Sequence, residues 1–275
     1  MKKIVESTTF PRTKQSITED LKALGLKKGM TVLVHSSLSS IGWVNGGAVA
    51  VIQALIDVVT EEGTIVMPSQ SVELSDPKEW GNPPVPEEWW DIIRESMPAY
   101  NSNYTPTTRG MGQIVELFRS YPEVKRSNHP NYSFVAWGKH KNKILNQHPL
   151  EFGLGEQSPL GKLYIRESYV LLLGADFDSS TSFHLAEYRI PYQKIINRGA
   201  PIIVEGKRVW KEYKELEFRE ELFQEVGQAF EAEHNMKVGK VGSANCRLFS
   251  LTEAVDFAEK WFINNDSKNI KNSLV

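Results

Sequence analysis

Short apolar runs and helix-spaced apolar positions follow one another in the first third of the chain. Residues 31–35 and 64–68 are almost wholly apolar, as is typical of buried strands. Between them, residues 48–59 carry apolar side chains at helical spacing, and Gly63 marks the end of this helix. A strand, a helix and a strand in this order predict two parallel strands joined by a right-handed crossover.

The rest of the chain continues with both kinds of pattern. Residues 169–173 are apolar without alternation, which predicts a central strand. Glu205-Gly206-Lys207 lies between two apolar stretches and predicts the turn of a hairpin, after which a helix is expected from Leu216 to His234. Further helices are predicted from a capping box at Ser16 to Gly25, from Thr105-Pro106 to Phe118, over 139–146, after Ser158 and over 252–262, and further strands over 132–137 and 237–241.

One long stretch, residues 69–104, has no regular periodicity. It holds seven acidic residues, three tryptophans and several prolines. A loop of this length in a compact domain is usually functional or disordered, and the tryptophans argue against disorder. We therefore predict a single α/β domain over 1–265, with a mostly parallel central sheet flanked by helices, a long acidic Trp-rich insertion and a C-terminal α+β extension. Residues 266–275 are predicted to be a frayed polar tail.

Charge and cysteine content narrow the functional classes. The net charge of the 275 residues is −2, so neither a nucleic-acid partner nor an acidic membrane surface is expected. No apolar run is long enough to cross a membrane, and the positive start of the chain lacks the apolar stretch of a signal peptide. Cys246 is the sole cysteine, so no internal disulfide forms. The expected location is the cytoplasm, and no metal site is indicated.

The strongest chemical signal is the segment Thr181–Glu187. His184 and Glu187 are three residues apart and share one face of a predicted helix, just beyond the predicted central strand. A strand end followed by an imidazole and a carboxylate favours a general base. A surface pair of little energetic weight is the alternative. Asp176, Asp178 and Glu187 all remain candidate partners of His184.

Other loops add weaker signals, each of which an ordinary cap or turn would also explain. His35–Ser40, followed by Asn45-Gly46-Gly47, offers hydroxyl and backbone N–H groups suited to an anion. Arg126–Ser133 combines a cation, an imidazole and hydroxyls, which suits phosphate groups. Gly153–Leu163 has glycines that allow a ligand to approach the backbone. The acidic, Trp-rich stretch suits a polycationic or sugar-like ligand.

Five segments together resemble the aminoglycoside 3-N-acetyltransferase family, in the form found in its Bacillus branch. They occur in the family's order and spacing, and the resemblance is strong over about residues 10–190 and looser beyond. The segments are His35–Ser39, Arg109–Gly112, Arg126–Pro130, Gly155–Tyr164 and Thr181–Glu187.

The resemblance implies transfer of an acetyl group from acetyl-CoA to the 3-amino group of an aminoglycoside, by direct attack in a ternary complex. His184 becomes the general base, with Glu187 and Asp178 as acidic neighbours. The residues expected along acetyl-CoA are His35, Ser36, Ser37, Leu38, Ser39, Met111, Gly112, Arg126, Ser127, His129, Ser133, Glu156, Ser158, Pro159, Leu160 and Leu163. The residues expected at the acceptor are Glu73, Asp76, Trp80, Trp89, Trp90 and Thr181.

Alternatives remain at this point. The same chemistry on a different amine is one, and a CoA- or aminoglycoside-binding protein with little turnover is another. A ping-pong acyltransferase or thioesterase would need Cys246 or a serine as nucleophile. The aromatic residues also permit a homodimer.

Overall fold

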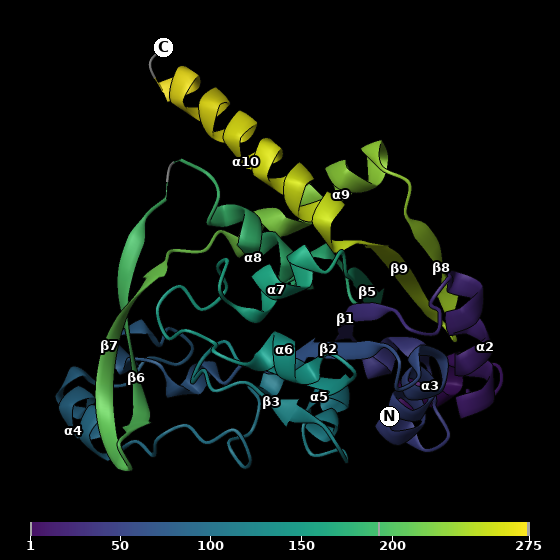
Figure 1. The fold of residues 1–275 in the computed structure, drawn as a ribbon, viewed down its shortest axis with the longest axis horizontal. Helices are drawn as coiled ribbons and strands as arrows, with labels where there is room; N and C mark the ends of the chain where they lie inside the picture. Colours follow the sequence, from purple (N-terminus) through teal and green to yellow (C-terminus); the bar gives the residue numbers. More distant parts are fainter. Residues whose placement is uncertain (1, 192, 274–275) are drawn as a thin grey trace.

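The structure is a computed structural model that describes residues 2–191 and 193–273. A seven-stranded sheet forms its middle (Figure 1). The strand order is β3-β4-β2-β1-β5-β9-β8. The three central strands, β2, β1 and β5, are parallel, while β4, β3, β9 and β8 join by antiparallel pairing. The strands of this sheet are β1 (Thr31–Ser36), β2 (Thr64–Pro68), β3 (Lys125–Arg126), β4 (Phe134–Gly138), β5 (Tyr169–Leu173), β8 (Lys237–Val241) and β9 (Ala244–Ser250). The predicted single α/β domain is confirmed, and the C-terminal strands complete its central sheet.

Helices cover both faces of the sheet. The helices are α1 (Lys2–Ser7), α2 (Lys14–Leu24), α3 (Gly47–Val59), α4 (Trp90–Ser96), α5 (Gln113–Phe118), α6 (Lys141–Leu145), α7 (Pro159–Ile165), α8 (Ser182–Glu187), α9 (Phe223–Glu233) and α10 (Leu251–Ser273). Short 3₁₀ turns are η1 (Leu38–Ile41), η2 (Val72–Leu74), η3 (Pro77–Glu79), η4 (Glu87–Trp89), η5 (Arg109–Met111), η6 (Phe177–Ser179) and η7 (Glu220–Leu222). Among the described residues, no helix is both long and apolar enough to span a membrane.

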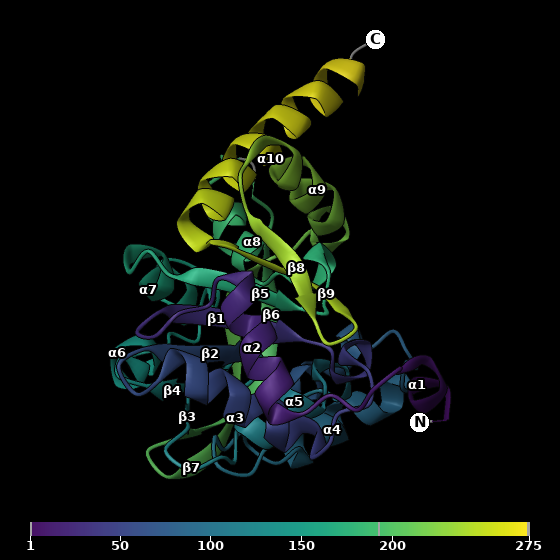
Figure 2. The same ribbon diagram turned by 90° about the vertical axis from the view of Figure 1, so that its right-hand side faces the viewer.

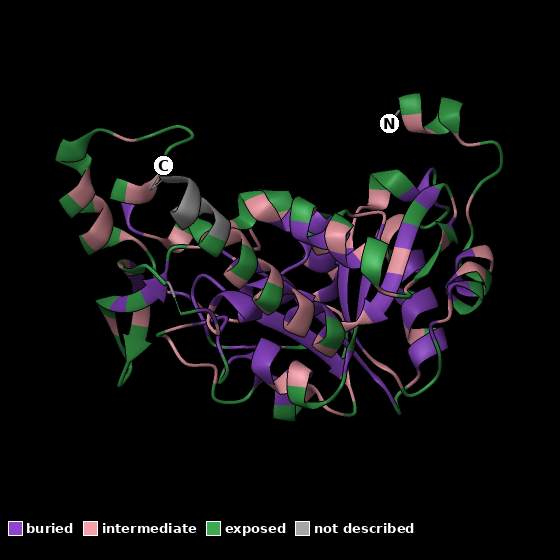
Figure 3. Cartoon of the chain, turned by 90° about the horizontal axis from the view of Figure 1, so that it is seen from above, coloured by how far each residue is buried: buried purple, intermediate pink, exposed green. Residues whose placement is uncertain are grey.

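Two hydrophobic cores lie on opposite faces of the sheet. Successive side chains of a strand point to opposite faces, so Val32 and Val34 of β1 pack with α2 and α3. Leu33 of the same strand packs with residues of α8, α9 and α10 on the other face. Figure 3 shows the buried strands enclosed between partly exposed helices. The absence of alternation in the central strands reflects this burial on both faces.

A long two-stranded hairpin stands beside the main sheet (Figure 1). Its strands are β6 (Ile195–Val204) and β7 (Lys207–Leu216), and they turn at Glu205-Gly206 as predicted. The hairpin packs against the insertion, where Tyr100 donates its N–H to Pro201 O at 3.1 Å. Arg208 Nε likewise donates to Met97 O at 3.0 Å. The insertion itself folds into three short 3₁₀ turns and α4, too short to produce a readable periodicity.

The boundaries of several elements differ from those predicted. Thr13, not Ser16, caps α2: its hydroxyl accepts the Ser16 N–H, and the Ser16 hydroxyl accepts the Thr13 N–H. The helix predicted from Leu216 begins only at Phe223, because Leu216 pairs with Ile195 in the hairpin and residues 217–222 form a loop and η7. Strand β9 was not predicted. Helix α10 continues to Ser273 and projects from the body (Figure 2), so the segment predicted as a tail is helical that far; residues 274–275 lie outside the described residues.

Candidate active site

The candidate site lies at the carboxyl ends of the parallel strands, the usual place for a site in an open α/β sheet. His35 and Ser36 end β1, and Pro68 ends β2. Gly174 follows β5 at a φ of 70°, a conformation that favours glycine. Its turn leads through η6 to α8, the helix that carries His184 and Glu187.

His184 and Glu187 form a buried pair. His184 Nδ1 lies 2.8 Å from Glu187 Oε2, and the two side chains are 4% and 3% exposed. An ionised carboxylate can only accept, so Nδ1 carries the proton and Nε2 of the neutral ring has a free lone pair. Glu187 Oε1 accepts the backbone N–H of Arg219 at 2.7 Å. Both carboxylate oxygens are therefore satisfied, and the imidazole is held in one tautomer and orientation.

Two aromatic rings hold the imidazole plane. The His184 ring centroid lies 4.3 Å from that of Phe218 and 4.8 Å from that of Phe223. On its other edge, His184 Nε2 lies 3.5 Å from Oε1 of Glu220. The imidazole thus has Nδ1 on Glu187 and Nε2 near Glu220.

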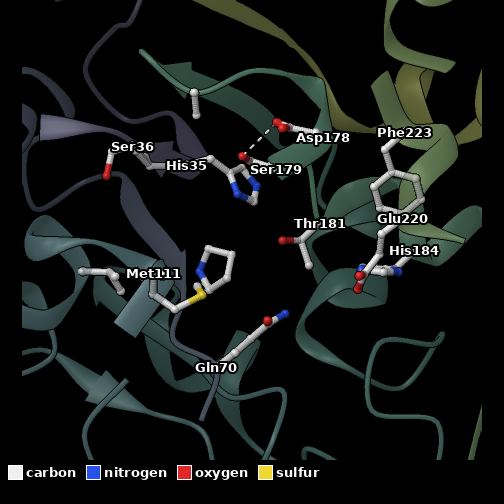
Figure 4. A pocket seen from close by; sticks show the side chains of 15 residues that line it. His35, Ser36, Gln70, Met111, Asp178, Ser179, Thr181, His184, Glu220 and Phe223 are labelled. Carbon is white, nitrogen blue, oxygen red and sulfur yellow. Dashed lines mark hydrogen bonds and ion pairs between the residues drawn. The ribbon is translucent and has the colours of Figure 1, made fainter. Parts of the chain in front are cut away.

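Three adjoining cavities lie at the strand ends, and His184 lines the central one. The central cavity, of about 280 Å³, is lined by His35, Thr181 and His184 among others. Figure 4 shows these three side chains with Met111 and Gln70 on the facing wall. The central cavity shares Ser36, Asp178 and Ser179 with a larger cavity on one side, and shares Gln70 and Glu220 with another on the opposite side. Ligands in the two outer cavities would therefore both reach the central cavity, which His184 lines.

The first outer cavity, called the strand-end cavity, has a volume of about 770 Å³. It lies between the turn after β1, the start of α3 and the turn after β5. Hydroxyl groups of Ser36, Ser37 and Ser39 line it. Gly42, Gly47, Gly112 and Gly174 also line it, so a ligand can approach the backbone closely there. This cavity therefore collects the predicted acetyl-CoA residues Ser36–Ser39 and Gly112.

The second outer cavity, called the hairpin cavity, has a volume of about 590 Å³ and lies between the insertion and the base of the β6–β7 hairpin. Its described lining includes four carboxylates and one guanidinium, together with four aromatic rings. These residues are Glu73, Glu79, Glu217, Glu220 and Arg198, and Trp80, Tyr132, Tyr213 and Phe218. Arg198 pairs with Glu79, which leaves the wall negatively charged. Such a wall suits a cationic, sugar-like ligand.

His35 faces His184 across the central cavity. Burial is the main cause that lowers the pKa of His35 to about 3, and a proton on His184 would lower it further. Its imidazole is therefore neutral at physiological pH, and its buried Nε2 has no partner within the described residues. A neutral imidazole can hydrogen-bond a ligand without competing with His184 for a proton.

The structure does not bring the predicted group around Arg126 to the wall of any of the three cavities. Arg126 donates to Ser71 Oγ at 2.8 Å, to Ser133 Oγ at 3.0 Å and to the carbonyl of Thr105. Ser127 Oγ accepts the N–H of Phe134, and His129 Nδ1 accepts the N–H of Tyr132, both at 2.9 Å. These polar groups are occupied in joining the insertion to β4.

The segment predicted to complete the CoA channel also lies outside these cavities. Ser158 caps α7 with Pro159 at its first turn, as predicted, but Leu160 and Leu163 are buried in the core. Glu156 forms a hydrogen-bonded pair with Arg189 at 2.6 Å. The start of a helix and a ligand-binding loop can have the same local sequence pattern. The burial of the side chains distinguishes the two here.

The insertion contributes some predicted acceptor residues and not others. Glu73 and Trp80 line the hairpin cavity, and Thr181 lines the central one. Asp76 is buried in a pair with Arg94 at 2.8 Å. Trp89 is exposed away from the three cavities, and Trp90 stacks on Arg94 instead of lining them. Asp178 lines the central cavity but bonds Ser179 and not His184.

Sequence reasoning missed Glu220, Phe218, Phe223 and Gln70. The first three follow the hairpin, in a stretch interpreted as an ordinary amphipathic helix. Gln70 lies at the start of the aperiodic insertion, directly after β2. Its place after a strand end was an available signal, whereas nothing local distinguished Glu220 from Glu221.

Comparisons with known proteins agree with this geometry. A family model for aminoglycoside 3-N-acetyltransferases matches residues 33–263. Aminoglycoside N(3)-acetyltransferase IX of Micromonospora chalcea is 31% identical, over 91% of this chain and 93% of the relative. The crystal structure of the YokD protein from Bacillus subtilis is similar at 99% identity and a TM-score of 0.97, covering 98% of this chain and 99% of that one. A binary complex of AAC-IIIb with CoASH is 30% identical with a TM-score of 0.83, covering 93% and 98%.

Proposed function

The chain belongs to the aminoglycoside 3-N-acetyltransferase family, and from this premise we propose that it transfers the acetyl group of acetyl-CoA to the 3-amino group of an aminoglycoside. The observation that carries the proposal is the pair of proton acceptors at the junction of the cavities. His184 Nε2 and Glu220 Oε1 lie 3.5 Å apart, and when the imidazole is neutral with its proton on Nδ1, both atoms can accept a hydrogen bond. An amine nitrogen beside this pair can donate one N–H to each of the two atoms.

Acetyl-CoA suits the strand-end cavity. Glycine and serine residues line that cavity, and it opens onto the central cavity beside His35 and Ser36. A solved relative of similar fold holds CoASH. When bound, acetyl-CoA supplies the acetyl group as a thioester, whose carbonyl carbon would lie in the central cavity near Thr181.

The aminoglycoside suits the hairpin cavity. Its carboxylates attract ammonium groups, and the rings of Trp80, Tyr132 and Phe218 offer surfaces to the apolar faces of sugars. Glu220 lines both this cavity and the central one. A cationic acceptor held there would present one amino group to His184.

His184 would then act as general base in a ternary complex. As the amine nitrogen bonds to the acetyl carbon, Nε2 accepts the proton that the nitrogen loses, and Glu187 stabilises the resulting imidazolium. The bond from carbon to sulfur breaks, and the thiolate takes a proton to leave as CoASH. The products are the acetylated aminoglycoside, which carries a new amide, and the thiol CoASH. Holding both reactants together contributes on the order of 7 kcal/mol in favourable cases.

Cys246 is poorly suited to a ping-pong alternative. It is fully buried in β9, and burial raises the pKa of its thiol. A nucleophilic cysteine needs access and a lowered pKa. Direct transfer therefore fits the site better than an acyl-enzyme on this residue.

The test is release of CoA thiol from acetyl-CoA in the presence of a panel of aminoglycosides, with a control lacking acceptor. Release that depends on an aminoglycoside is the expected result. Release without acceptor would instead indicate a thioesterase or an acyl-enzyme. No release, with acetyl-CoA binding seen by calorimetry, would overturn the aminoglycoside as acceptor and leave another amine or a binding role.

A further inference from the structure

Three consecutive residues, Phe218, Arg219 and Glu220, touch the His184–Glu187 pair from three sides. The Phe218 ring packs against the imidazole at an interplanar angle of 53°, with centroids 4.3 Å apart. The Arg219 backbone N–H donates to Glu187 Oε1 at 2.7 Å, and Glu220 Oε1 lies 3.5 Å from His184 Nε2. We call these three residues the strap.

The strap has little backbone support of its own. It follows the last paired residue of β7, Leu216, and its first two residues belong to neither helix nor strand. Glu217 donates its N–H to Lys194 O at 2.8 Å, just before the strap begins. Beyond that point the strap depends on side-chain contacts for its position.

The side chain of Arg219 supplies such a contact, and it reaches the C-terminal helix. Arg219 Nη1 donates to Asp266 Oδ1 at 2.7 Å, and the guanidinium carbon lies 4.7 Å from the centre of the Phe262 ring. The side chains of Arg219 and Asp266 are 27% and 14% exposed, so water screens this pair less than a surface pair. Phe262 is fully buried in the hydrophobic core that also contains Leu33, so this part of α10 is fixed in position.

The guanidinium itself lines none of the three cavities. Its contacts are to α10, while its backbone N–H contacts the catalytic pair. Arg219 is thus placed to act through other residues and not on a substrate.

We propose that Arg219 is a positioning residue. Its side-chain contacts with Asp266 and Phe262 of α10 keep the strap in place against His184 and Glu187. The C-terminal helix thereby sets the geometry of acetyl transfer from a distance. This inference rests on the proposed function, since it assigns the strap to the same reaction.

Kinetics of substituted proteins test the proposal. Asp266→Asn and Arg219→Met remove the ion pair, and kcat should fall about tenfold, as expected for a small misplacement of a catalytic group. The KM for the aminoglycoside should rise, because Phe218 and Glu220 line the hairpin cavity. The KM for acetyl-CoA should stay within about twofold, because other elements line the strand-end cavity. Arg219→Lys, which keeps the charge, should retain most of kcat.

A matched control lies on the same helix. Asp256 accepts the hydroxyl of Tyr164 at 2.7 Å and does not touch the strap. Asp256→Asn should therefore leave kcat near that of the unchanged protein. Equal losses in Asp256→Asn and Asp266→Asn would overturn the proposal in favour of a general loosening of α10.

Amide hydrogen exchange gives a readout that needs no turnover. Exchange across residues 217–222 should speed up in Asp266→Asn and not in Asp256→Asn, because the bond from Arg219 N–H to Glu187 is weakened. If the unchanged protein acetylates none of the aminoglycosides, the proposed function fails. The amide exchange rates of residues 217–222 would still test whether Arg219 and Asp266 hold the strap in place. Unchanged exchange in Asp266→Asn overturns the strap, whatever the turnover.

Discussion

His184 Nδ1 donates a hydrogen bond to Glu187 Oε2 over 2.8 Å, and both side chains are almost completely buried. The pair lies on one face of α8, three residues apart. Because the other oxygen of Glu187 is also bonded, the imidazole cannot turn without breaking buried hydrogen bonds. This relationship determines which nitrogen of His184 reaches the cavity.

Removing the imidazole should abolish most of the chemistry. His184→Ala is expected to lower kcat about 10²–10⁴-fold, the usual contribution of a general base. Glu187→Gln should lower kcat about 10²-fold or more, because the ring loses its fixed tautomer. The measurement is CoA thiol release at saturating substrates. Calorimetry should find the acetyl-CoA affinity of both variants nearly unchanged, and turnover at the original rate in His184→Ala would remove it as the base.

Glu220 should govern the acceptor and not acetyl-CoA. Glu220→Gln is expected to raise the KM for the aminoglycoside about fivefold, in keeping with the loss of one partly exposed charge pair of about 1 kcal/mol. The adjacent Glu221→Gln makes the same change in net charge but alters no residue lining the three cavities. If both variants raise this KM alike, the effect comes from the overall field of the protein and not from contact.

Arg126 should matter for stability more than for acetyl-CoA. Arg126→Ala removes the donor to Ser71, Ser133 and the Thr105 carbonyl, and takes a hydrogen bond from each of these buried acceptors. We expect a loss of about 3 kcal/mol in the free energy of unfolding, measured by urea denaturation. The acetyl-CoA Kd of the folded variant should stay close to the original. A large rise in that Kd without a loss of stability would restore Arg126 to the ligand path.

Buried histidines should make the protein sensitive to acid. Burial lowers the pKa of His148 to about 4 and that of His35 to about 3, from an ordinary value of 6.5. Above pH 6.5 each is neutral in both states, so its full contribution to stability is present. As the pH falls below 6.5, the unfolded chain takes up a proton that the folded one refuses, and stability is lost down toward the folded pKa.

The same linkage predicts a measurable difference for one variant. Between pH 7 and pH 5, each such imidazole should cost about 2 kcal/mol, so His148→Gln should lose that much less stability over this range. Urea denaturation at the two pH values measures the difference. His140→Gln is a control, because burial and nearby cations lower the pKa of this imidazole less than that of His148. Equal acid sensitivity of the unchanged protein and His148→Gln would contradict the linkage.

Local features of the chain were predictable where local forces determine them. The strands at 31–36 and 64–68 and the helix between them follow from the spacing of apolar residues, and Gly25 ends α2 in a left-handed conformation as its position suggests. The placing of His184 and Glu187 on one helix face follows from helical geometry alone. These features depend on hydrogen bonds and contacts within a few residues.

Which polar segments line the cavities was decided only by the tertiary structure. Glu220 meets His184 because the hairpin returns the chain to the strand ends, and no local pattern separates it from Glu221. Arg126 and Leu160 are predicted ligand residues, but packing between distant segments places the Arg126 guanidinium against backbone carbonyls and Leu160 in the core, outside the three cavities. Burial depends on which segments of the whole chain pack around a residue. The sequence by itself therefore determined most helices and strands and the spacing of His184 and Glu187. The cavities and the strap around this pair were decided only by the tertiary structure.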